Sequence, residues 1–514
     1  MNGKGAVLFA ALLVAALMLP QGILAADEDI QKKVDDLSKE VQALQQQVAQ
    51  SKEGSKEGKK SISDWLTIGG DYRFRVDSLS GKVPNYYGFA NIVGWQMGGM
   101  VGPPPLTQGE TVKNNLLYTN RFGLNLKAKA TRNVTFTSRL LMYKAFGNGD
   151  TTATSGNFFA DRIGVFDGTQ GHVPGDGKLT VDQAYVTWAN ILDAPVWFSV
   201  GRRPSTGGIP SHLRQNDEKP GNGGIPALLV DYAFDGMTLG WAPDIEALPG
   251  AYAKLCYGRG YENGFVSPSS ANNGLKDTDM LGVSVVPYDT DRLYLDFQYN
   301  RGMNIFDFPV FASSSLGPLS PHTDLGNIDW YGVTALSTLK KTGPGTLNVF
   351  ASAALSKTHP NQNTVVFGGI DTGAGLMHSG TKESTTGNAF YVGARYDVTS
   401  TRTKIGAEFN HGSKNWITFT PAADDIWTSK LGARGNVYEL YVIQEINAAP
   451  VSSYIAKAFF RFGFQYYDFD YTGSNNWVGA PVKISDLSAS PRNAQMLTPL
   501  KSARDLYATM EVKF

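Results

Sequence analysis

The sequence predicts an all-β fold, a transmembrane antiparallel β-barrel of about 16 strands, preceded by a short N-terminal coiled-coil helix. Three observations lead to this prediction. Extended segments alternate between apolar and charged residues, their connections alternate between short and long, and one early hydrophobic segment has the features of an export signal. The 514 residues then divide into a signal peptide (1–26), a periplasmic coiled coil (27–50), a flexible linker (51–64) and an outer-membrane β-barrel (65–514).

The composition excludes several classes of protein. Lys and Arg together number 46, as do Asp and Glu, so the bulk charge does not favour a nucleic-acid partner. Cys256 is the one cysteine, which excludes an internal disulfide framework and a cysteine-only metal site. The sequence has no CxxCH motif, which excludes a c-type haem attached to this chain.

Export is predicted from the first 26 residues, MNGKGAVLFAALLVAALMLPQGILAA. Lys4 precedes an apolar run over 6–18, and the small residues Ala25 and Ala26 offer a cleavage site. The alternative is a retained anchor, but the run is short for a membrane span. Since no later segment has about 18 consecutive apolar residues, we expect an exported protein without a spanning helix. With the strand alternation, this predicts the outer membrane of a Gram-negative cell.

A short coiled coil is predicted over residues 27–50. Apolar residues step by 4, 3, 4, 3 and 4 positions at Ile30, Val34, Leu37, Val41, Leu44 and Val48. The alternative is a single amphipathic helix lying against the barrel. Valine at a positions favours two-stranded pairing, whereas porins are usually trimers, and the sequence leaves that conflict open. The SKEG repeat that follows is typical of a flexible tether.

The strand pattern begins at WLTIGGDYRFRVD. Leu66 and Ile68 lie on one face, and Arg73 and Arg75 lie on the other. Charged side chains in a dry core are costly, whereas in a barrel they face a wet lumen and the apolar set faces lipid. RFGLNLKAKAT and AFFRFGFQYY repeat the pattern, and DLYATMEVKF continues it to Phe514 as a closing strand. The competing fold is a soluble β protein, which would need apolar residues on the inner face.

The connections between strands set the strand count. Short connections are predicted at 130–133, 190–195, 242–250, 287–292, 340–345, 398–403 and 447–453. Long ones are predicted near 78–114, 145–180, 204–226, 261–278, 302–326, 359–388, 411–434 and 472–502. They require about 16 strands, and an even count places both termini on the periplasmic side. Asp235-Gly236 could form a hairpin turn, but we interpret it as a bulge in a strand over 227–242, because a turn would break the alternation.

A barrel of about 16 strands retains an aqueous channel. The predicted function is therefore an outer-membrane porin for passive diffusion of small hydrophilic solutes. The side chains predicted to line the pore are Arg73, Arg75, Arg121, Lys127, Arg139, Arg395 and Arg461. Inward cations outnumber the inward acids Asp71, Asp231, Asp296, Glu408 and Glu439. This excess predicts a mild preference for anions, unless the charges pair across strands and leave a weakly selective pore.

A constriction is predicted in the third long loop, within SVGRRPSTGGIPSHLRQNDEKPGNGG. In general porins the loop after the fifth strand folds into the channel, and this loop holds the same position. Its candidate residues are Arg202, Arg203, His212 and Arg214. The alternative is a surface loop with solvated charges.

Catalysis is not expected. The sequence has no GxSxG, HExxH or Walker A motif, and its six histidines are not spaced as a metal pair. We therefore predict no catalytic residue, cofactor or metal ligand.

Five segments resemble a known family: DIQKKVDDLSKEVQALQQQV, WLTIGGDYRFRVDSL, TNRFGLNLKAKATRNVTFTSRLLMYKAFG, VGRRPSTGGIPSHLR and KLCYGRGYENGF. The family is a group of uncharacterised, porin-like outer-membrane proteins with an N-terminal coiled coil. It is catalogued as a domain of unknown function and found mainly in metal-reducing Gram-negative bacteria. The resemblance covers essentially the whole mature chain and implies an outer-membrane channel that supports respiration onto extracellular acceptors.

Two further functions remain open. The barrel could be a sheath or scaffold for multihaem cytochromes in extracellular electron transfer, or the coiled coil could make it a structural envelope tether. The expected partners are outer-membrane lipid, further copies of the chain with a trimer favoured, and a periplasmic or cytochrome partner.

Overall fold

The computed structural model describes residues 62–99, 101–149, 174–203, 207–220, 228–231, 234–265, 275–307, 321–367, 370–420, 422, 425–447 and 456–514. The predicted signal peptide, the coiled coil and most of the linker lie outside these residues. The last three residues of the predicted linker and Trp65 form the short helix α3 (Ile62–Trp65).

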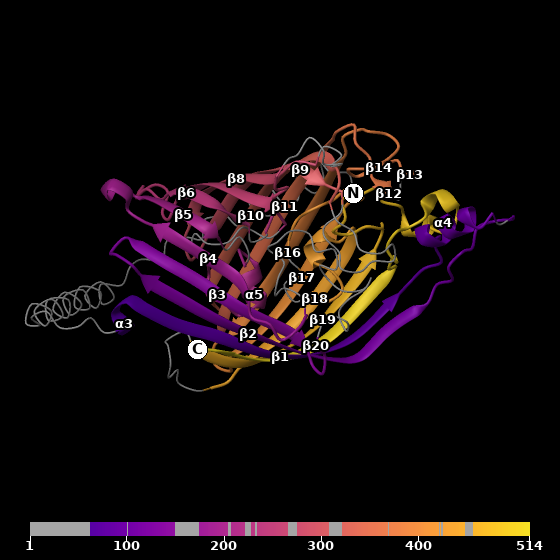
Figure 1. The fold of residues 1–514 in the computed structure, drawn as a ribbon. Coiled ribbons are helices and arrows are strands. Elements are labelled where there is room, and N and C mark those ends of the chain that lie inside the picture. Colours follow the sequence, from indigo (N-terminus) through magenta and orange to yellow (C-terminus); the bar gives the residue numbers. More distant parts are fainter. Residues whose placement is uncertain are drawn as a thin grey trace, which may run out of the picture.

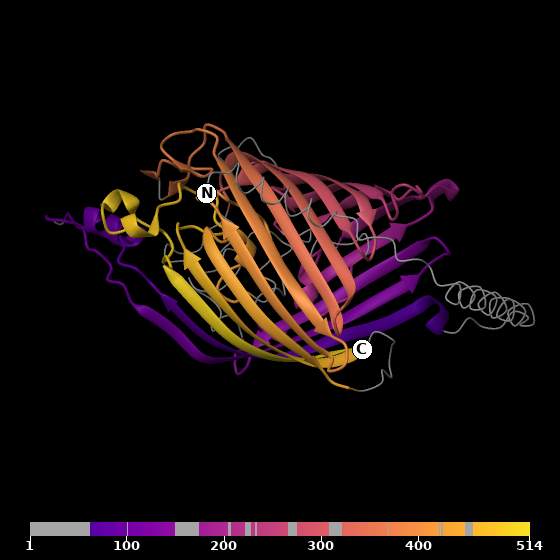
Figure 2. The same cartoon turned by 180° about the vertical axis from the view of Figure 1, so that it is seen from behind.

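A closed barrel of sixteen antiparallel strands forms the body of the molecule (Figure 1). The strands are β1 (Leu66–Lys82), β2 (Thr111–Lys129), β3 (Val134–Ala145), β4 (Thr180–Trp188), β5 (Val196–Arg202), β6 (Asp235–Trp241), β7 (Tyr252–Tyr261), β8 (Thr278–Asp289), β9 (Tyr294–Phe306), β10 (Asp324–Thr342), β11 (Gly345–Pro360), β16 (Thr386–Val398), β17 (Thr403–Gly412), β18 (Gly435–Glu445), β19 (Lys457–Phe469) and β20 (Ser502–Lys513). Figure 2 shows the wall made of the C-terminal strands, in orange and yellow. The predicted barrel and its strand count are confirmed.

The short turns gather at one end of the barrel. Between β2 and β3 the turn covers the predicted residues 130–133, and the carbonyl of Val134 accepts the N–H of Ala130 at 2.9 Å. The helix α3 and the end of β20 lie at this same end (Figure 1). Because short turns and termini are periplasmic in outer-membrane barrels, we call it the periplasmic end.

The long connections lie at the other end and carry small elements. These are α4 (Phe89–Met97), η4 (Ile484–Asp486), η5 (Pro491–Asn493) and the two short hairpins β12 (Val366–Phe367) with β13 (Ile370–Asp371) and β14 (Ala374–Gly375) with β15 (His378–Ser379). The 3₁₀ helix η2 (Ile191–Asp193) lies in the short connection between β4 and β5. The helix α5 (Ser211–Arg214) lies between β5 and β6, and the 3₁₀ helix η3 (Lys430–Gly432) lies between β17 and β18.

Apolar side chains cover the outer face of the barrel. Exposed large hydrophobic residues on successive strands include Ile68, Tyr118, Phe136, Trp188, Val200, Leu239, Leu255, Val283, Phe297, Tyr331, Ile405, Leu440, Phe462 and Leu506. Such a belt is stable against acyl chains and unfavourable against water. In the described part of the chain, no helix is long and apolar enough to cross a membrane.

The last strand closes the barrel. β20 pairs with β1 from Lys513 opposite Asp71 to Ser502 opposite Lys82. In this pairing each inward-facing residue of β1 lies opposite an inward-facing residue of β20, and the same holds for the outward-facing residues. Arg73, for example, lies opposite Glu511. The period-two pattern of the sequence therefore defines the register at the closure.

The interior is more densely packed than a water-filled lumen. Inward polar side chains such as Arg73 and Arg75 are 1% exposed. Leu228, Trp330 and Trp416 belong to an apolar cluster inside the barrel. The predicted strand over 227–242 is wrong in its first half, because β6 begins at Asp235. Residues 228–231 are fully buried instead, which shields inner-wall side chains from water.

Candidate channel constriction

The loop after β5 crosses the lumen to the far wall. In the ring order β5 and β17 lie opposite each other, and α5 contacts β16 and β19, which lie on either side of the pair β17–β18. Arg395 Nη1 on β16 donates to the carbonyl of Leu213 at 2.5 Å, and Arg461 Nη1 on β19 donates to that of Arg214 at 2.7 Å. The last carbonyls of a short helix lack partners within it, and these two arginines supply them.

The same loop continues to the periplasmic end. Lys513 Nζ on β20 donates to the carbonyl of Gln215 at 2.9 Å, and Lys404 Nζ on β17 donates to Asn216 Oδ1 at 2.6 Å. Lys219 forms an ion pair with Asp289, the last residue of β8. We call residues 207–220 the inward loop.

A second loop, between β17 and β18, packs against it inside the barrel. Trp416 Nε1 donates to the carbonyl of Leu431 at 2.8 Å, which folds this loop on itself. Thr418 Oγ1 donates to the carbonyl of Leu229 at 2.7 Å, which joins this loop to residues 228–231, a later part of the connection that contains the inward loop. The sequence predicts this segment, 411–434, as a long connection and does not place it inside the barrel. The three large apolar residues of its NWITF segment, Trp416, Ile417 and Phe419, are the signal that indicates burial.

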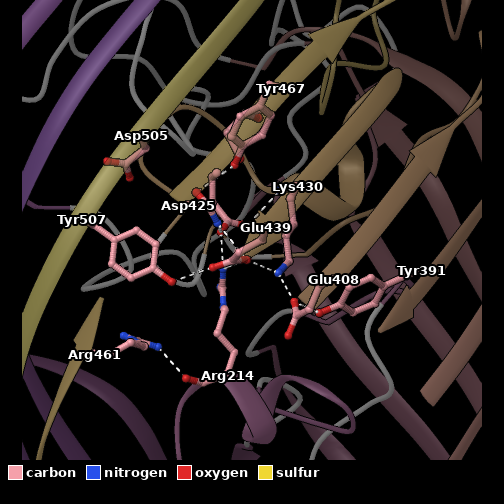
Figure 3. Close-up of polar contacts among 12 residues, drawn as sticks. Arg214, Tyr391, Glu408, Asp425, Lys430, Glu439, Arg461, Tyr467, Asp505 and Tyr507 are labelled. Atoms are coloured by element: carbon pink, nitrogen blue, oxygen red, sulfur yellow. Dashed lines mark hydrogen bonds and ion pairs between the residues drawn. The ribbon is translucent and has the colours of Figure 1, made fainter. Parts of the chain in front are cut away.

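Charged residues from both loops and two strands meet in the middle of the barrel (Figure 3). We call them the luminal charge cluster: Arg214, Glu408, Asp425, Lys430 and Glu439. Arg214 Nη1 lies 2.6 Å from Asp425 Oδ1 and 2.9 Å from Glu439 Oε2. Lys430 Nζ lies 2.5 Å from Glu439 Oε2 and also pairs with Glu408.

Neutral side chains on the wall complete the hydrogen bonding of the cluster. Tyr507 Oη donates to Glu439 Oε1 at 2.7 Å, Tyr391 Oη donates to Glu408 Oε2 at 2.5 Å, and Gln465 Nε2 donates to Asp425 Oδ1 at 2.7 Å. Buried charges are tolerated when they are paired and hydrogen-bonded. The cluster therefore binds both loops to β16–β20 by a network of bonds.

Three of the arginines predicted to line the pore lie on the inner face of the barrel wall, where they contact neighbouring side chains. Arg75 pairs with Asp77 at 2.6 Å and with Asp505 at 2.8 Å. Arg461 pairs with Glu511 at 2.8 Å, and Arg73 lies over the ring of Tyr143, 5.1 Å from its centroid. Arg75 and Arg461 thus hold the seam between β19, β20 and β1 together.

The remaining four predicted pore-lining residues occupy different places. Arg139 pairs with Asp71 at 2.6 Å, and Arg121 lies 3.5 Å from the same carboxylate. Arg395 pairs with Asp397 at 2.7 Å and bonds to α5. Lys127 is exposed, close to the periplasmic end of β2.

The four residues predicted for the constriction divide between two faces. Arg202 lies two residues after the exposed Val200 on β5, so its side chain points to the same outer face. There it pairs with Asp235 at 3.1 Å. Its predicted place in the constriction is therefore wrong. Arg203 turns inward and bonds to Thr238. His212 and Arg214 lie on α5, at 5% and 4% exposure.

His212 is held uncharged by its surroundings. Burial, together with the positive charges of Arg395 and Lys219, lowers the pKa of His212 to about 3. The imidazole is therefore neutral at neutral pH.

A cavity of about 350 Å³ lies between the inward loop and the wall β1–β4. Its acidic side chains are Asp71, Asp182, Asp217, Glu218, Asp231 and Asp425. Its basic side chains are Arg121, Arg139, Arg214, Lys430, Lys457 and Lys513. Several of these opposite charges are in direct contact, as Arg139 is with Asp71 and Arg214 is with Asp425.

A closed ring of antiparallel strands with an apolar exterior, a polar inner face and an inward loop defines a porin-like transmembrane β-barrel. The chain belongs to the family described as "Protein of unknown function (DUF3373)", whose model matches residues 111–514. This agrees with the predicted membership of a family of unknown function. No curated protein matches the chain in sequence.

Three solved structures are similar to this chain at low sequence identity. OmpT of Vibrio cholerae, in its trimer form, is 11% identical, with 88% of this chain and 100% of that chain covered and a TM-score of 0.38. OprB of Pseudomonas putida at high pH is 11% identical, with 88% and 95% covered and a TM-score of 0.41. OmpF of Salmonella typhi in complex with daunomycin is 9% identical, with 87% and 97% covered and a TM-score of 0.37.

Proposed function

We propose that the protein is an outer-membrane channel for passive diffusion of small hydrophilic solutes. The single observation that carries this proposal is the charged cavity between the inward loop and the wall β1–β4. It begins at the periplasmic end beside Lys513 and extends past Arg139 to Tyr143. Solutes would pass along this wall, because the rest of the lumen is occupied by the two inward-folded loops.

The proposed selectivity is a slight preference for anions. The cavity itself carries equal numbers of acids and bases, so opposite effects on permeant ions largely cancel there. Lys127 and Lys129 are both exposed towards the periplasmic end of β2. Among the described residues no ion pair involves either of them, so their charge supports a modest attraction of anions.

Conductance in planar bilayers tests the channel. Purified protein is expected to give discrete single-channel currents, with a reversal potential in a salt gradient that indicates mild anion preference. Replacing both lysines, Lys127→Gln with Lys129→Gln, should remove that preference while the conductance remains. A protein that folds and inserts but passes no current would contradict the channel, and a clear cation preference in the parent would contradict the selectivity.

We also propose that the protein is a homo-oligomer, with β4–β6 facing a second copy. β5 and β6 have seven residues each, fewer than the roughly 9–11 of a membrane-spanning strand. With the usual tilt they span about 18 Å, against an apolar band about 25 Å tall. The outward pair Arg202–Asp235 at their upper ends would then lie at the level of acyl chains, where charges are unfavourable. A protein neighbour removes that cost.

Labelling with a membrane-soluble maleimide tests this interface in a Cys256→Ser background. Met237→Cys on β6 should be protected in the native oligomer, whereas Leu440→Cys on the opposite strand β18 should react. Both parent side chains are exposed in the isolated chain, at 43% and 60%. Equal labelling would disprove the interface, and light scattering with a mass of three copies would support the trimer.

The two other functions open from the sequence have less support. A cytochrome sheath needs an interior wide enough for another polypeptide, but the inward loop and the loop between β17 and β18 occupy that space. A tether through the coiled coil concerns residues outside the described part of the chain and stays a prediction.

A further inference from the structure

A second cavity lies at the extracellular end, away from the proposed solute path. It has a volume of about 520 Å³, within the usual range for small-molecule sites. Its walls come from α4 and from the loops between β11 and β16, between β17 and β18, and between β19 and β20. Figure 1 shows α4 beside the last loop, in yellow, at this end of the barrel.

Most of its lining is apolar. Phe89 and Ile92 of α4 line it together with Trp427, Val478 and Met496 of the other segments. Phe89 and Ile92 are half-buried in the absence of any occupant. Water in contact with so much apolar surface is readily displaced by an apolar ligand.

Hydrogen bonds fix the walls in place. The N–H of Phe89 donates to the carbonyl of Gln495 at 2.9 Å, and the N–H of Gln495 donates to the carbonyl of Tyr87 at 2.8 Å. Tyr86 Oη donates to Thr498 Oγ1 at 3.3 Å. The helix α4 is therefore attached to the last long loop, and the cavity is formed before any ligand binds.

One buried cation lines this apolar cavity. Arg434 is 1% exposed, and its guanidinium donates to the carbonyls of Trp416 at 2.8 Å, Thr472 at 2.9 Å and Asn476 at 2.7 Å. Among the described residues no ion pair joins it to a carboxylate. Burial lowers the pKa of Arg434 to about 9, so at neutral pH it stays protonated.

The charges at the rim do not offset that buried cation. Arg492 and Asp371 also line the cavity, and both are exposed, where solvent screens them. A buried positive charge that neutral acceptors alone surround, without an anionic partner, is stabilised further by an anion of suitable shape.

We propose that this cavity is an extracellular binding site for a small amphipathic carboxylate, with its apolar body among the side chains from α4 and the last long loop and its carboxylate beside Arg434. The site does not depend on conduction through the barrel. Its ligand enters from outside the cell and contacts none of the charged residues of the solute path.

Calorimetric titration of the purified full-length protein tests the proposal, with 3-phenylpropionate as the probe and 3-phenylpropanol as its neutral counterpart. The acid should bind saturably and at least about tenfold more tightly than the alcohol, which is the effect of one charged hydrogen bond. Equal affinities, or no saturable binding of the acid up to about 10 mM, would overturn the proposal.

Three variants locate the site. Arg434→Gln should weaken binding of the acid about tenfold and leave binding of the alcohol unchanged. Ile92→Trp adds bulk to the cavity from α4, and it should abolish binding of both probes. Arg492→Gln, the matched cation at the rim, should change the affinity less than twofold. If Arg434→Gln fails to fold, Ile92→Trp decides: undiminished binding in that variant refutes the site.

Discussion

The backbone of Phe514 is bonded in both directions to Gly70 on β1: its N–H donates to the Gly70 carbonyl at 2.9 Å, and its carbonyl accepts the Gly70 N–H at 2.8 Å. A side chain at position 70 would meet the Phe514 ring, since an added Cβ would lie 2.9 Å from Cζ. The absence of a side chain at Gly70 therefore lets the aromatic ring close the outer surface where the first and last strands meet.

Deletion of Phe514 should weaken this closure. Two backbone hydrogen bonds are lost, each about 1 kcal/mol, together with the ring contact over Gly70. We expect a smaller fraction of barrel in the heat-modifiable form on a denaturing gel run without boiling. Phe514→Leu keeps both backbone bonds and should fold nearly as well as the parent. Equal folding of the deletion variant and the parent would show that the contact is dispensable.

Arg214→Met should release the inward loop. Asp425 and Glu439 would lose a cation in a buried site, and loss of one partner from such a pair costs about 3–5 kcal/mol. Because Met retains most of the length of the side chain, the change removes charge and hydrogen bonds and leaves the packing similar. We expect a larger and noisier single-channel current and faster proteolysis within the inward loop.

Arg202→Met is the matched control for that experiment. It removes an arginine only twelve positions away, but from the outer face, where the side chain pairs with exposed Asp235. Its current should equal that of the parent. If the two variants behave alike, the luminal charge cluster does not hold the loop.

The sequence was sufficient for the strands and turns because these depend on local pattern. The alternation in β1 separates Arg73 from Ile68, and the structure places them on the inner and outer faces, at 1% and 60% exposure. The turn at 130–133 lies where it was predicted. Closure by β20 follows from the same period, since a shift of one residue would exchange the two faces.

The position of the loops could not be predicted in the same way. The bond between Thr418 and Leu229 joins residues 189 apart, and Arg214 meets Glu439 across 225 positions. Neither contact has a local periodicity. The neighbours Arg202 and Arg203 show this limit of sequence-based prediction most directly. Their side chains lie on opposite faces of the barrel wall, and the sequence does not show which of the two points outward.

Arg139→Gln should shift the selectivity of the channel towards cations. Arg139 lines the cavity and pairs with Asp71 at 2.6 Å, so its loss leaves an acidic excess on the wall β1–β4. The ratio of anion to cation permeability should fall about twofold, measured from the reversal potential in a salt gradient. Arg202→Gln should leave the ratio unchanged. The assignment of the solute path to this wall fails if both variants shift it equally or neither does.

Acidification should loosen the inward loop through His212. Its pKa is about 3 in the folded protein, against about 6.5 when exposed, so between these pH values the displaced loop binds a proton that the packed loop does not. Stability of the packed loop is therefore complete above pH 6.5 and decreases as the pH falls towards 3, by at most about 5 kcal/mol. The current should become noisier over this range. His212→Gln cannot take up the proton, so its noise should change less with pH, and an identical pH dependence in both proteins would exclude His212 as the cause.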